Sequence, residues 1–217
     1  MEQAKQYETI FKRKSIRKYE QDPLEESTLT AIADFVKGLK PLFADIKTQM
    51  NIVGHKDVKI LMPIKAPHYL MVYAEKKEGY LTQVGYMLQQ VDLFLSANGI
   101  GSCYLGMAQP AIADTSLEFV MILAFGHAKD AVHRANISEF NRKELSKITD
   151  ISNLEALLEP VRLAPSASNG QPWFFTGDQN VIHAFCNKPN MIKALLYEKM
   201  NKVDMGIALY HLEVAAA

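Results

Sequence analysis

One stretch decides how this sequence is interpreted: Ala164-Pro165-Ser166-Ala167-Ser168-Asn169-Gly170-Gln171-Pro172-Trp173. Two prolines, small hydroxyl residues, an Asn and a Gln are typical of a tight, irregular loop that presents many hydrogen-bonding groups. We expect this loop to connect a helix to a strand that begins near Trp173. It could hold a planar heterocycle by its polar edge, although an ordinary proline-rich turn has the same composition.

The residue patterns of the first half return in the second half. Four pairs of segments match in the same order: 11–19 with 140–148, 22–25 with 152–155, 66–71 with 171–176, and 84–92 with 204–213. The second pair, Asp22–Glu25 and Ser152–Glu155, has the residue types of a capping box at a helix start. Each match alone is weak, but their common order predicts two copies of one structural unit, residues 1–135 and residues 136–217.

Apolar periodicity predicts alternating helices and strands in the first half. We expect a helix from about Pro23 to Gly38, a buried strand over 69–74, a long helix over 80–98, and a second buried strand over 119–125. Residues 101–106 are expected to form a loop or a short strand, whereas residues 41–66 show no clear pattern. Strands separated by helices indicate an α+β or α/β sandwich.

Composition and charge limit the classes of function. The chain has 217 residues, of which 48% are hydrophobic and 22% charged, and this excludes disordered, collagen-like and coiled-coil proteins. Because its formal net charge is +0, no overall field favours nucleic acid or an anionic membrane, and no apolar run approaches the ~18 residues of a membrane span. We therefore expect a cytoplasmic, soluble protein with a small-molecule substrate.

Cysteine and histidine spacing gives no sign of a metal site or a disulfide framework. Only Cys103 and Cys186 are present, one in each half, and no pair of histidines has ligand spacing. We interpret both cysteines as thiols that pack in the core or line a site.

The loop at 165–173, taken with Arg13-Lys14-Ser15-Ile16-Arg17-Lys18-Tyr19, resembles the nitroreductase family of FMN-dependent oxidoreductases. The resemblance extends to residues 99–106 and to Leu123–His127, followed by Arg134 and Arg142. It implies an α+β nitroreductase-like sandwich, with a mixed β-sheet flanked by helices. Members of the family are homodimers with two FMN sites, each built from both subunits.

The resemblance also implies which residues bind FMN. The phosphate and ribityl chain would be held by Arg13, Ser15 and Arg17, with Lys14 nearby and Arg142 as a later basic residue. The ring or ribityl chain would contact Pro165, Ser166, Ala167, Asn169 and Gln171, and the other region of the ring would lie against Tyr104, Leu105 and Gly106. Guanidinium donors suit a phosphate, although the basic segment could equally be a solvated charged surface. No general acid or base and no metal ligand is assigned.

The two halves depart from the family pattern in complementary ways. The first half has only Met62–Pro67 where the Ser-Asn-Gln-Pro-Trp loop is expected, and the second half has Glu144 where the phosphate-binding Ser is expected. We therefore predict an intrachain pseudo-dimer, resembling the branch of the family in which one chain imitates the dimer. It would be a monomer with one intact flavin site and one that has lost its function.

The function implied is electron transfer from NADH or NADPH through FMN to a nitroaromatic, quinone or similar planar acceptor by a ping-pong reaction. No Rossmann fingerprint or P-loop is present, so the nicotinamide would be a transient donor. Two alternatives stay open. One is a flavin-binding or flavin-free homologue that acts as a binding protein or sensor, and the other is a purely structural duplicated domain.

Overall fold

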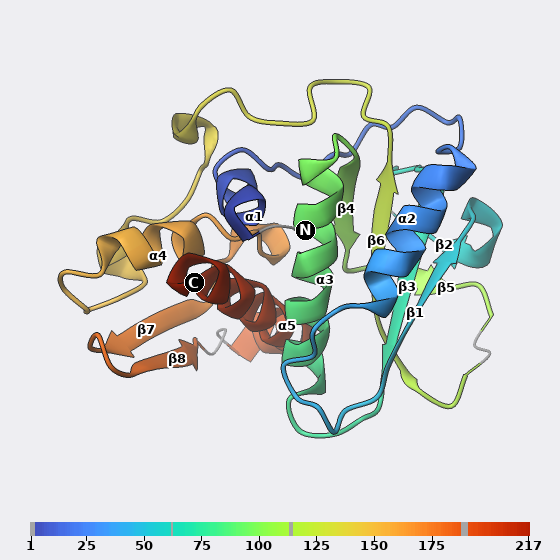
Figure 1. Cartoon of the computed structure of the whole chain (residues 1–217). Coiled ribbons are helices and arrows are strands. Elements are labelled where there is room, and N and C mark those ends of the chain that lie inside the picture. Colours follow the sequence, from blue (N-terminus) through green and yellow to red (C-terminus); the bar gives the residue numbers. More distant parts are fainter. Residues whose placement is uncertain (1–2, 62, 113–114, 188–190) are drawn as a thin grey trace.

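The computed structural model describes residues 3–61, 63–112, 115–187 and 191–217, and the side chains of the last segment from Tyr197 onward. Its helices are α1 (Gln3–Ile10), α2 (Glu26–Lys37), α3 (Tyr80–Ala97), α4 (Glu155–Arg162) and α5 (Met191–Ala216). Its strands are β1 (Thr48–Val53), β2 (Val58–Lys59), β3 (His68–Ala74), β4 (Gly101–Leu105), β5 (Gln109–Pro110), β6 (Glu118–Gly126), β7 (Trp173–Gly177) and β8 (Ile182–Cys186). Figure 1 shows their arrangement.

Four strands of the first half form the main sheet, in the order β1-β3-β6-β4. All three neighbouring pairs are antiparallel; for example, Leu70 of β3 lies opposite Leu123 of β6. The fold is α+β as expected, but this sheet is antiparallel and not mixed. The physical reason is the connectivity, because β4 and β6 are joined without a helical crossover, and such a connection returns the chain in the opposite direction.

The two faces of this sheet are covered differently. Leu70 and Val72 of β3 face a core that includes Ile32 of α2 and Leu88 of α3, so the helices cover one face. Alternate residues of the same strand, such as Tyr69, face a second apolar cluster with segments outside the helices. This alternation is what a strand buried on both faces requires.

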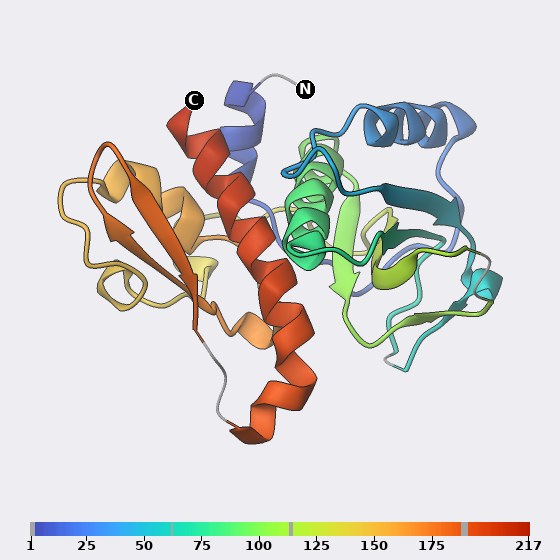
Figure 2. The same ribbon diagram turned by 90° about the horizontal axis from the view of Figure 1, so that it is seen from below.

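The second half is smaller and is arranged around one long helix. Strands β7 and β8 form an antiparallel pair, and α4 and α5 pack against each other beside it. Helix α5 also packs across α3 at a steep angle, so these two helices form the junction between the halves (Figures 1 and 2). Trp173 and Phe175 of β7 are fully buried in the same core as α3.

Two glycines allow the backbones of α3 and α5 to touch. A Cβ added to Gly85 would lie 1.9 Å from the carbonyl oxygen of Val203, and one added to Gly206 would lie 1.8 Å from that of Thr82. No side chain fits at either point, so glycine is required by close approach and not by an unusual φ. The contact fixes how near the two halves lie.

Both predicted capping boxes are wrong. Helix α2 begins with Glu25 as N-cap, and α4 with Leu154, and neither side chain caps its helix. At the first site the Leu24 side chain is buried, and its N–H donates to Nε2 of His68 at 2.9 Å, so tertiary contacts displace the local cap. At the second site Asn153 has φ of 64°, a left-handed conformation that breaks the expected pattern.

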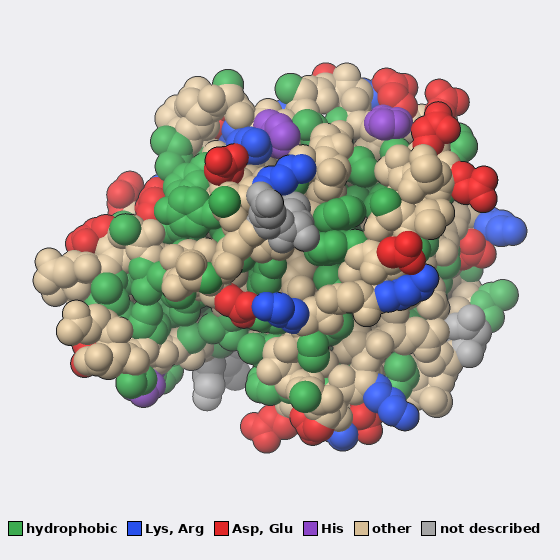
Figure 3. Space-filling model, in the orientation of Figure 1, with side chains coloured by type: hydrophobic (Ala, Val, Ile, Leu, Met, Phe, Trp, Pro, Cys, Tyr) green, Lys and Arg blue, Asp and Glu red, His purple; other side chains and the backbone are tan. Residues whose placement is uncertain are grey.

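Acidic and basic side chains are interspersed over the face of the molecule seen in Figure 3. Within the ranges that the structure describes, no helix is long and apolar enough to cross a membrane. In the same residues, no group of three or more His, Cys, Asp or Glu side chains is placed to hold a metal ion.

Candidate functional site

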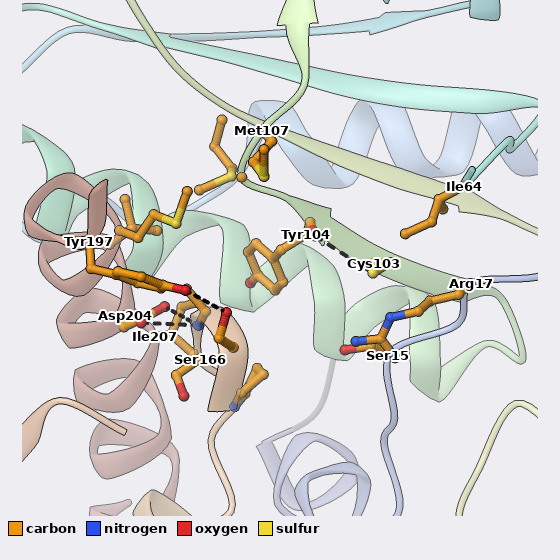
Figure 4. Close-up of a pocket in the computed structure, with 17 residues that line it drawn as sticks. Ser15, Arg17, Ile64, Cys103, Tyr104, Met107, Ser166, Tyr197, Asp204 and Ile207 are labelled. Atoms are coloured by element: carbon orange, nitrogen blue, oxygen red, sulfur yellow. Dashed lines mark hydrogen bonds between the residues drawn. The ribbon is translucent and has the colours of Figure 1, made fainter. Parts of the chain in front are cut away.

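A cavity of about 260 Å³ lies where the two halves meet. The first half contributes Ser15, Arg17, Ile64, Cys103, Tyr104, Gly106, Met107 and Met121, and the second half contributes Pro165, Ser166, Ala167, Ser168, Tyr197, Met200, Val203, Asp204 and Ile207 (Figure 4). Its walls are mainly apolar, with hydroxyl groups, one carboxyl and one guanidinium among them. The cavity is therefore shared between the two predicted units.

The N-terminal wall is an extended segment held against β4. The Ile16 N–H donates to the carbonyl oxygen of Ser102 at 2.8 Å, and Ser15 forms a parallel bridge with the same residue. The Ile16 side chain packs against Gly101, where an added Cβ would lie 2.8 Å from Cγ1 of Ile16. Because side chains alternate along an extended segment, burial of Ile16 directs Ser15 and Arg17 to the other side, where they line the cavity.

Arg13 lies in the protein interior and does not line the cavity. Its side chain is 1% exposed, and its Nε lies 3.0 Å from Oδ2 of Asp92, which is fully buried. Ser102 Oγ donates to Oδ1 of the same carboxylate at 2.6 Å, and Nη2 of Arg13 donates to Oγ of Ser15 at 3.3 Å. The guanidinium is therefore committed to balancing a buried charge. Lys14 is half-buried and is also outside the lining.

Tyr104 is held in the cavity wall by a buried polar chain that crosses between the halves. Its Oη–H donates to Oε1 of Gln89 at 2.9 Å, and Nε2 of Gln89 lies 3.0 Å from Nε2 of His211. His211 in turn donates from Nδ1 to the carbonyl oxygen of Pro160 at 2.7 Å. Burial lowers the pKa of His211 to about 3, so its ring is neutral and accepts from Gln89. These contacts fix the orientation of Tyr104.

The other two residues predicted on this wall are placed differently. The Leu105 side chain is buried in the second apolar cluster and does not line the cavity. Gly106 does line it, where an added Cβ would lie 2.9 Å from Cε of Met200. Cys103 also lines the cavity, and burial raises the pKa of its thiol, so it is a neutral, buried thiol of the wall.

The loop after α4 contributes Pro165, Ser166 and Ala167 to the cavity, and these are three of the five loop residues predicted to contact FMN. Its conformation is unusual, because Ser168 has φ of 50° and Asn169 φ of 55°. Such values are uncommon for residues other than glycine and persist where surrounding contacts impose them.

Those contacts come from residues 141–143. Asn169 Nδ2 donates to the carbonyl oxygen of Asn141 at 2.6 Å, and Nη1 of Arg142 donates to Oδ1 of Asn169 at 2.7 Å. The Lys143 N–H donates to Oε1 of Gln171 at 2.8 Å. Asn169, Gln171 and Arg142 therefore hold the loop in place and are absent from the cavity lining, and their predicted contact with FMN stays a prediction. The Arg142 pKa is lowered to about 10, first by burial and then by the neighbouring Arg13 cation.

Asp204 is a functional candidate that the sequence analysis did not identify. Its carboxyl is 4% exposed, lines the cavity, and accepts from the Ala167 N–H with both oxygens at 3.1 Å (Figure 4). Burial raises its pKa to about 8, and the hydrogen bond only partly offsets this. Asp204 begins the repeated segment 204–213, but a single acidic residue forms no spacing pattern that would indicate a functional role.

The rest of the α5 wall was also missed. It consists of Tyr197, Met200, Val203 and Ile207, which together with Asp204 follow the helical period and share one face of the helix. Tyr197 reaches across to the loop, where its Oη lies 3.1 Å from Oγ of Ser168. The helical periodicity could have grouped these residues. A stripe of Met, Val and Ile on a helix, however, more often packs in the hydrophobic core than lines a functional site.

Comparisons with known proteins bear on the family and the fold. The model of a family described as "Putative TM nitroreductase" matches residues 5–216. A solved structure described as a nitroreductase from Thermotoga maritima MSB8 is similar with 22% identity and a TM-score of 0.69, covering 97% of this chain and 83% of that one. At these identities a structural likeness shows the fold alone.

Two more solved structures resemble part of the chain. A nitroreductase family protein from Clostridium difficile 630 has 17% identity and a TM-score of 0.53, over 66% of this chain and 94% of that one. An FMN-dependent nitroreductase from Clostridium difficile R20291 has 17% identity over 61% of this chain and 93% of that one, but its TM-score of 0.49 is too low to support an argument. No curated protein of similar sequence is found.

Proposed function

Because the chain belongs to this nitroreductase family, we propose that it is an FMN-dependent oxidoreductase that transfers electrons from NAD(P)H to a nitroaromatic, quinone or similar planar acceptor. The observation that carries the proposal is the shared cavity. It brings Ser15, Arg17 and Tyr104 of the first half together with Pro165 to Ala167 of the second. These segments are distant in sequence and are the ones that the family resemblance associates with the flavin.

The residues present fit a planar group with an anionic chain. Apolar side chains such as Ile64, Met107 and Ile207 can pack against the faces of a ring system. Arg17 is exposed at the cavity, and no described ion pair involves it, so its guanidinium is available to a phosphate, with the Ser15 hydroxyl beside it. When bound, FMN would supply the hydride and electron chemistry.

The chain's own residues would then orient the ligand and exclude water. Tyr104, fixed through Gln89, gives a rigid surface on one side, and the loop at 165–168 gives main-chain and hydroxyl groups on the other. Arg13 acts at a distance in this proposal: by balancing Asp92 and donating to Ser15, it keeps the N-terminal wall in position. A rigid lining of this kind is what cofactor enzymes contribute to the reaction.

We also propose that the chain is an internally duplicated pseudo-dimer. When β2, which pairs with β5 outside the main sheet, is set aside, the order helix, strand, strand, helix occurs twice, as α2-β1-β3-α3 and as α4-β7-β8-α5, each with an antiparallel strand pair. The two glycines of the helix contact, Gly85 and Gly206, occupy equivalent places in α3 and α5. Each is preceded two positions earlier by a residue that accepts a hydrogen bond from a loop: Gln83 from the Phe43 N–H at 2.6 Å, and Asp204 from the Ala167 N–H.

A further equivalent contact lies five positions after each glycine. Gln90 donates to the carbonyl oxygen of Lys40 at 2.7 Å, and His211 donates to that of Pro160. These pairs support an equivalence of β7 with β1, in which the counterpart of the 164–172 loop would be residues 41–46. The sequence comparison had set that loop against 62–67, of which Met62 lies outside the described residues.

This proposed equivalence supports a single flavin site per monomeric chain. Residues 41–46 contain no Ser, Asn or Gln, and the ring of Phe43 lies so close to Gly79 that an added Cβ there would be 2.6 Å from it. Glu144 stands where the first half has Ser15, and a carboxylate there would repel a phosphate. The second, symmetry-related flavin site would thus lack both the polar loop and the phosphate-binding hydroxyl group.

Flavin reconstitution tests the proposal. We expect the protein to bind close to one FMN per chain, seen by flavin absorbance after gel filtration, and to lose the oxidised-flavin absorbance when NADH or NADPH is added without oxygen. Arg17→Ala should weaken FMN binding by about ten-fold or more, because a guanidinium–phosphate pair is lost. Lys18→Ala is the matched control, since the neighbouring side chain carries the same charge, is exposed and does not line the cavity.

Three results would contradict parts of the proposal. Absence of FMN binding would refute the cofactor, and binding of two per chain would refute the single site. Tight binding without bleaching by either nicotinamide would favour the binding protein or sensor.

A further inference from the structure

The Asp204 carboxyl is more than a structural acceptor. It anchors the loop at Ala167 through one N–H, which approaches both of its oxygens at 3.1 Å. An ionised carboxylate can accept about four hydrogen bonds, so a single donor leaves most of its capacity unused. The group is nevertheless 4% exposed and lies in the cavity wall.

The equivalent residue of the first half shows that the anchor does not need an acid. Gln83 accepts the Phe43 N–H with its amide oxygen, and its amide nitrogen donates to the carbonyl oxygen of Ile46 at 2.9 Å. The amide is fully buried, satisfied and neutral. Asp204, which can ionise, therefore anchors its loop at the proposed flavin site, whereas the neutral Gln83 anchors the equivalent loop in the first half.

No cation compensates the Asp204 carboxyl among the residues described. None of the described ion pairs includes it. The titratable groups on other elements whose pKa Asp204 influences are Tyr104 of β4 and Cys186 of β8, and burial raises the pKa of both, so both are neutral at pH 7. Arg17 lines the same cavity, but no described ion pair joins it to Asp204. On its own helix Lys202 lies two residues away, and its ammonium pairs with Glu198 at 3.1 Å. A buried carboxyl without a cation is stable mainly in its protonated form.

We propose that Asp204 is a catalytic acid of the cavity, which donates a proton to the oxygen of the acceptor while the acceptor is reduced. This inference rests on the proposed function. In that reaction the acceptor takes up one hydride, which bound, reduced FMN would supply, and one proton. Asp204 supplies the proton: an O–H bond forms on a quinone or nitro oxygen as the O–H bond of Asp204 breaks, and a nitro acceptor then releases water to give the nitroso product. The carboxylate regains its proton from water after the product leaves.

The position and acidity of the group suit this step. It shares the cavity with Tyr104 and the 165–168 loop, so a planar ligand between these walls lies beside it. A pKa of about 8 keeps the proton on the group at neutral pH and yet allows its transfer, which is the range in which general acids are effective.

Asp204→Asn tests the inference, because the amide keeps the size of the side chain and an acceptor for the Ala167 N–H. In stopped-flow experiments with FMN-loaded protein, we expect reduction by NAD(P)H to change by less than about two-fold. Reoxidation by a quinone at pH 7 should slow by about 100-fold, within the usual range for a general acid. The wild-type reoxidation rate should fall as pH rises through about 8, and that of the variant should not.

A second measurement needs neither cofactor nor turnover. Infrared difference spectra of the cofactor-free protein should show a protonated carboxyl group that titrates near pH 8 and is missing in Asp204→Asn. Equal reoxidation rates and equal pH profiles in the two proteins would overturn the role of Asp204 and leave the proposed function intact. If neither protein binds FMN or is reduced by NAD(P)H, the proposed function itself fails.

Discussion

Gly206→Ala is expected to destabilise the chain although alanine favours helices. The added Cβ would lie 1.8 Å from the carbonyl oxygen of Thr82 and 2.6 Å from the nitrogen of Tyr86, whereas real Cβ atoms essentially never come within 3.0 Å of such atoms. Helices α3 and α5 must therefore separate by about 1.2 Å, the difference between 1.8 and 3.0 Å. The atoms in the way belong to a helix backbone and cannot rotate aside.

The size of the effect follows from two opposing terms. Replacing glycine by alanine inside a helix stabilises it by about 1 kcal/mol, while overpacking a close-packed contact costs about 1 to 3 kcal/mol. Because the clash is with main-chain atoms where the two helices cross closely, we place its cost at the upper end. The expected net loss is about 2 kcal/mol in the free energy of unfolding.

Urea unfolding followed by circular dichroism measures this loss. The matched control is Gly38→Ala at the end of α2, where an added Cβ would lie 3.7 Å from its nearest neighbour, and we expect a change within about 0.5 kcal/mol there. An unfolding free energy of Gly206→Ala equal to or above that of the wild type would refute the close approach of the two helices. FMN affinity provides a second readout, since Val203 and Ile207 beside the glycine line the cavity.

Two other substitutions test the buried charges. Asp92→Asn removes the partner of Arg13, which is 1% exposed, and should cost about 3 to 5 kcal/mol in urea unfolding; a loss below about 1 kcal/mol would contradict a buried ion pair. For Asp204 the sign depends on pH: burial raises its pKa from 3.8 to about 8, so the wild type loses stability as pH rises between these values, at most by about 6 kcal/mol. The free energy of unfolding of Asp204→Asn should therefore rise relative to that of the wild type between pH 5 and pH 9. If the two free energies change with pH in parallel, the carboxyl titrates normally and the reasoning is refuted.

Strong apolar periodicity made part of the fold predictable from sequence. The helix over 80–98 and the strands over 69–74 and 119–125 are confirmed to within a residue or so as α3, β3 and β6. Strand β1 was missed because it is an edge strand of half-buried residues, with Gln49 and Asn51 among them, and so lacks a clear apolar pattern. Strand direction was also missed, because periodicity does not encode which strands become neighbours.

The candidate site was partly predictable for a different reason. Family motifs located the segments that meet at the cavity, including Ser15, Arg17 and Tyr104, but a motif does not distinguish a lining residue from a supporting one. Arg13 faces inward because Asp92, far along the chain, needs a buried cation. Asn169 is turned towards Arg142 by a left-handed loop. Both outcomes depend on tertiary contacts that no local pattern records.

The segment that lines the cavity with Ser15 and Arg17 also covers the edge of the main sheet. Strand β4 is the last in the order β1-β3-β6-β4, and its outer side is occupied at Ser102 by the main chain of residues 15–16. An uncovered edge strand pairs readily with other molecules and promotes aggregation. Changes that loosen this segment should therefore reduce solubility as well as ligand affinity, and a ligand that orders it should keep the protein soluble.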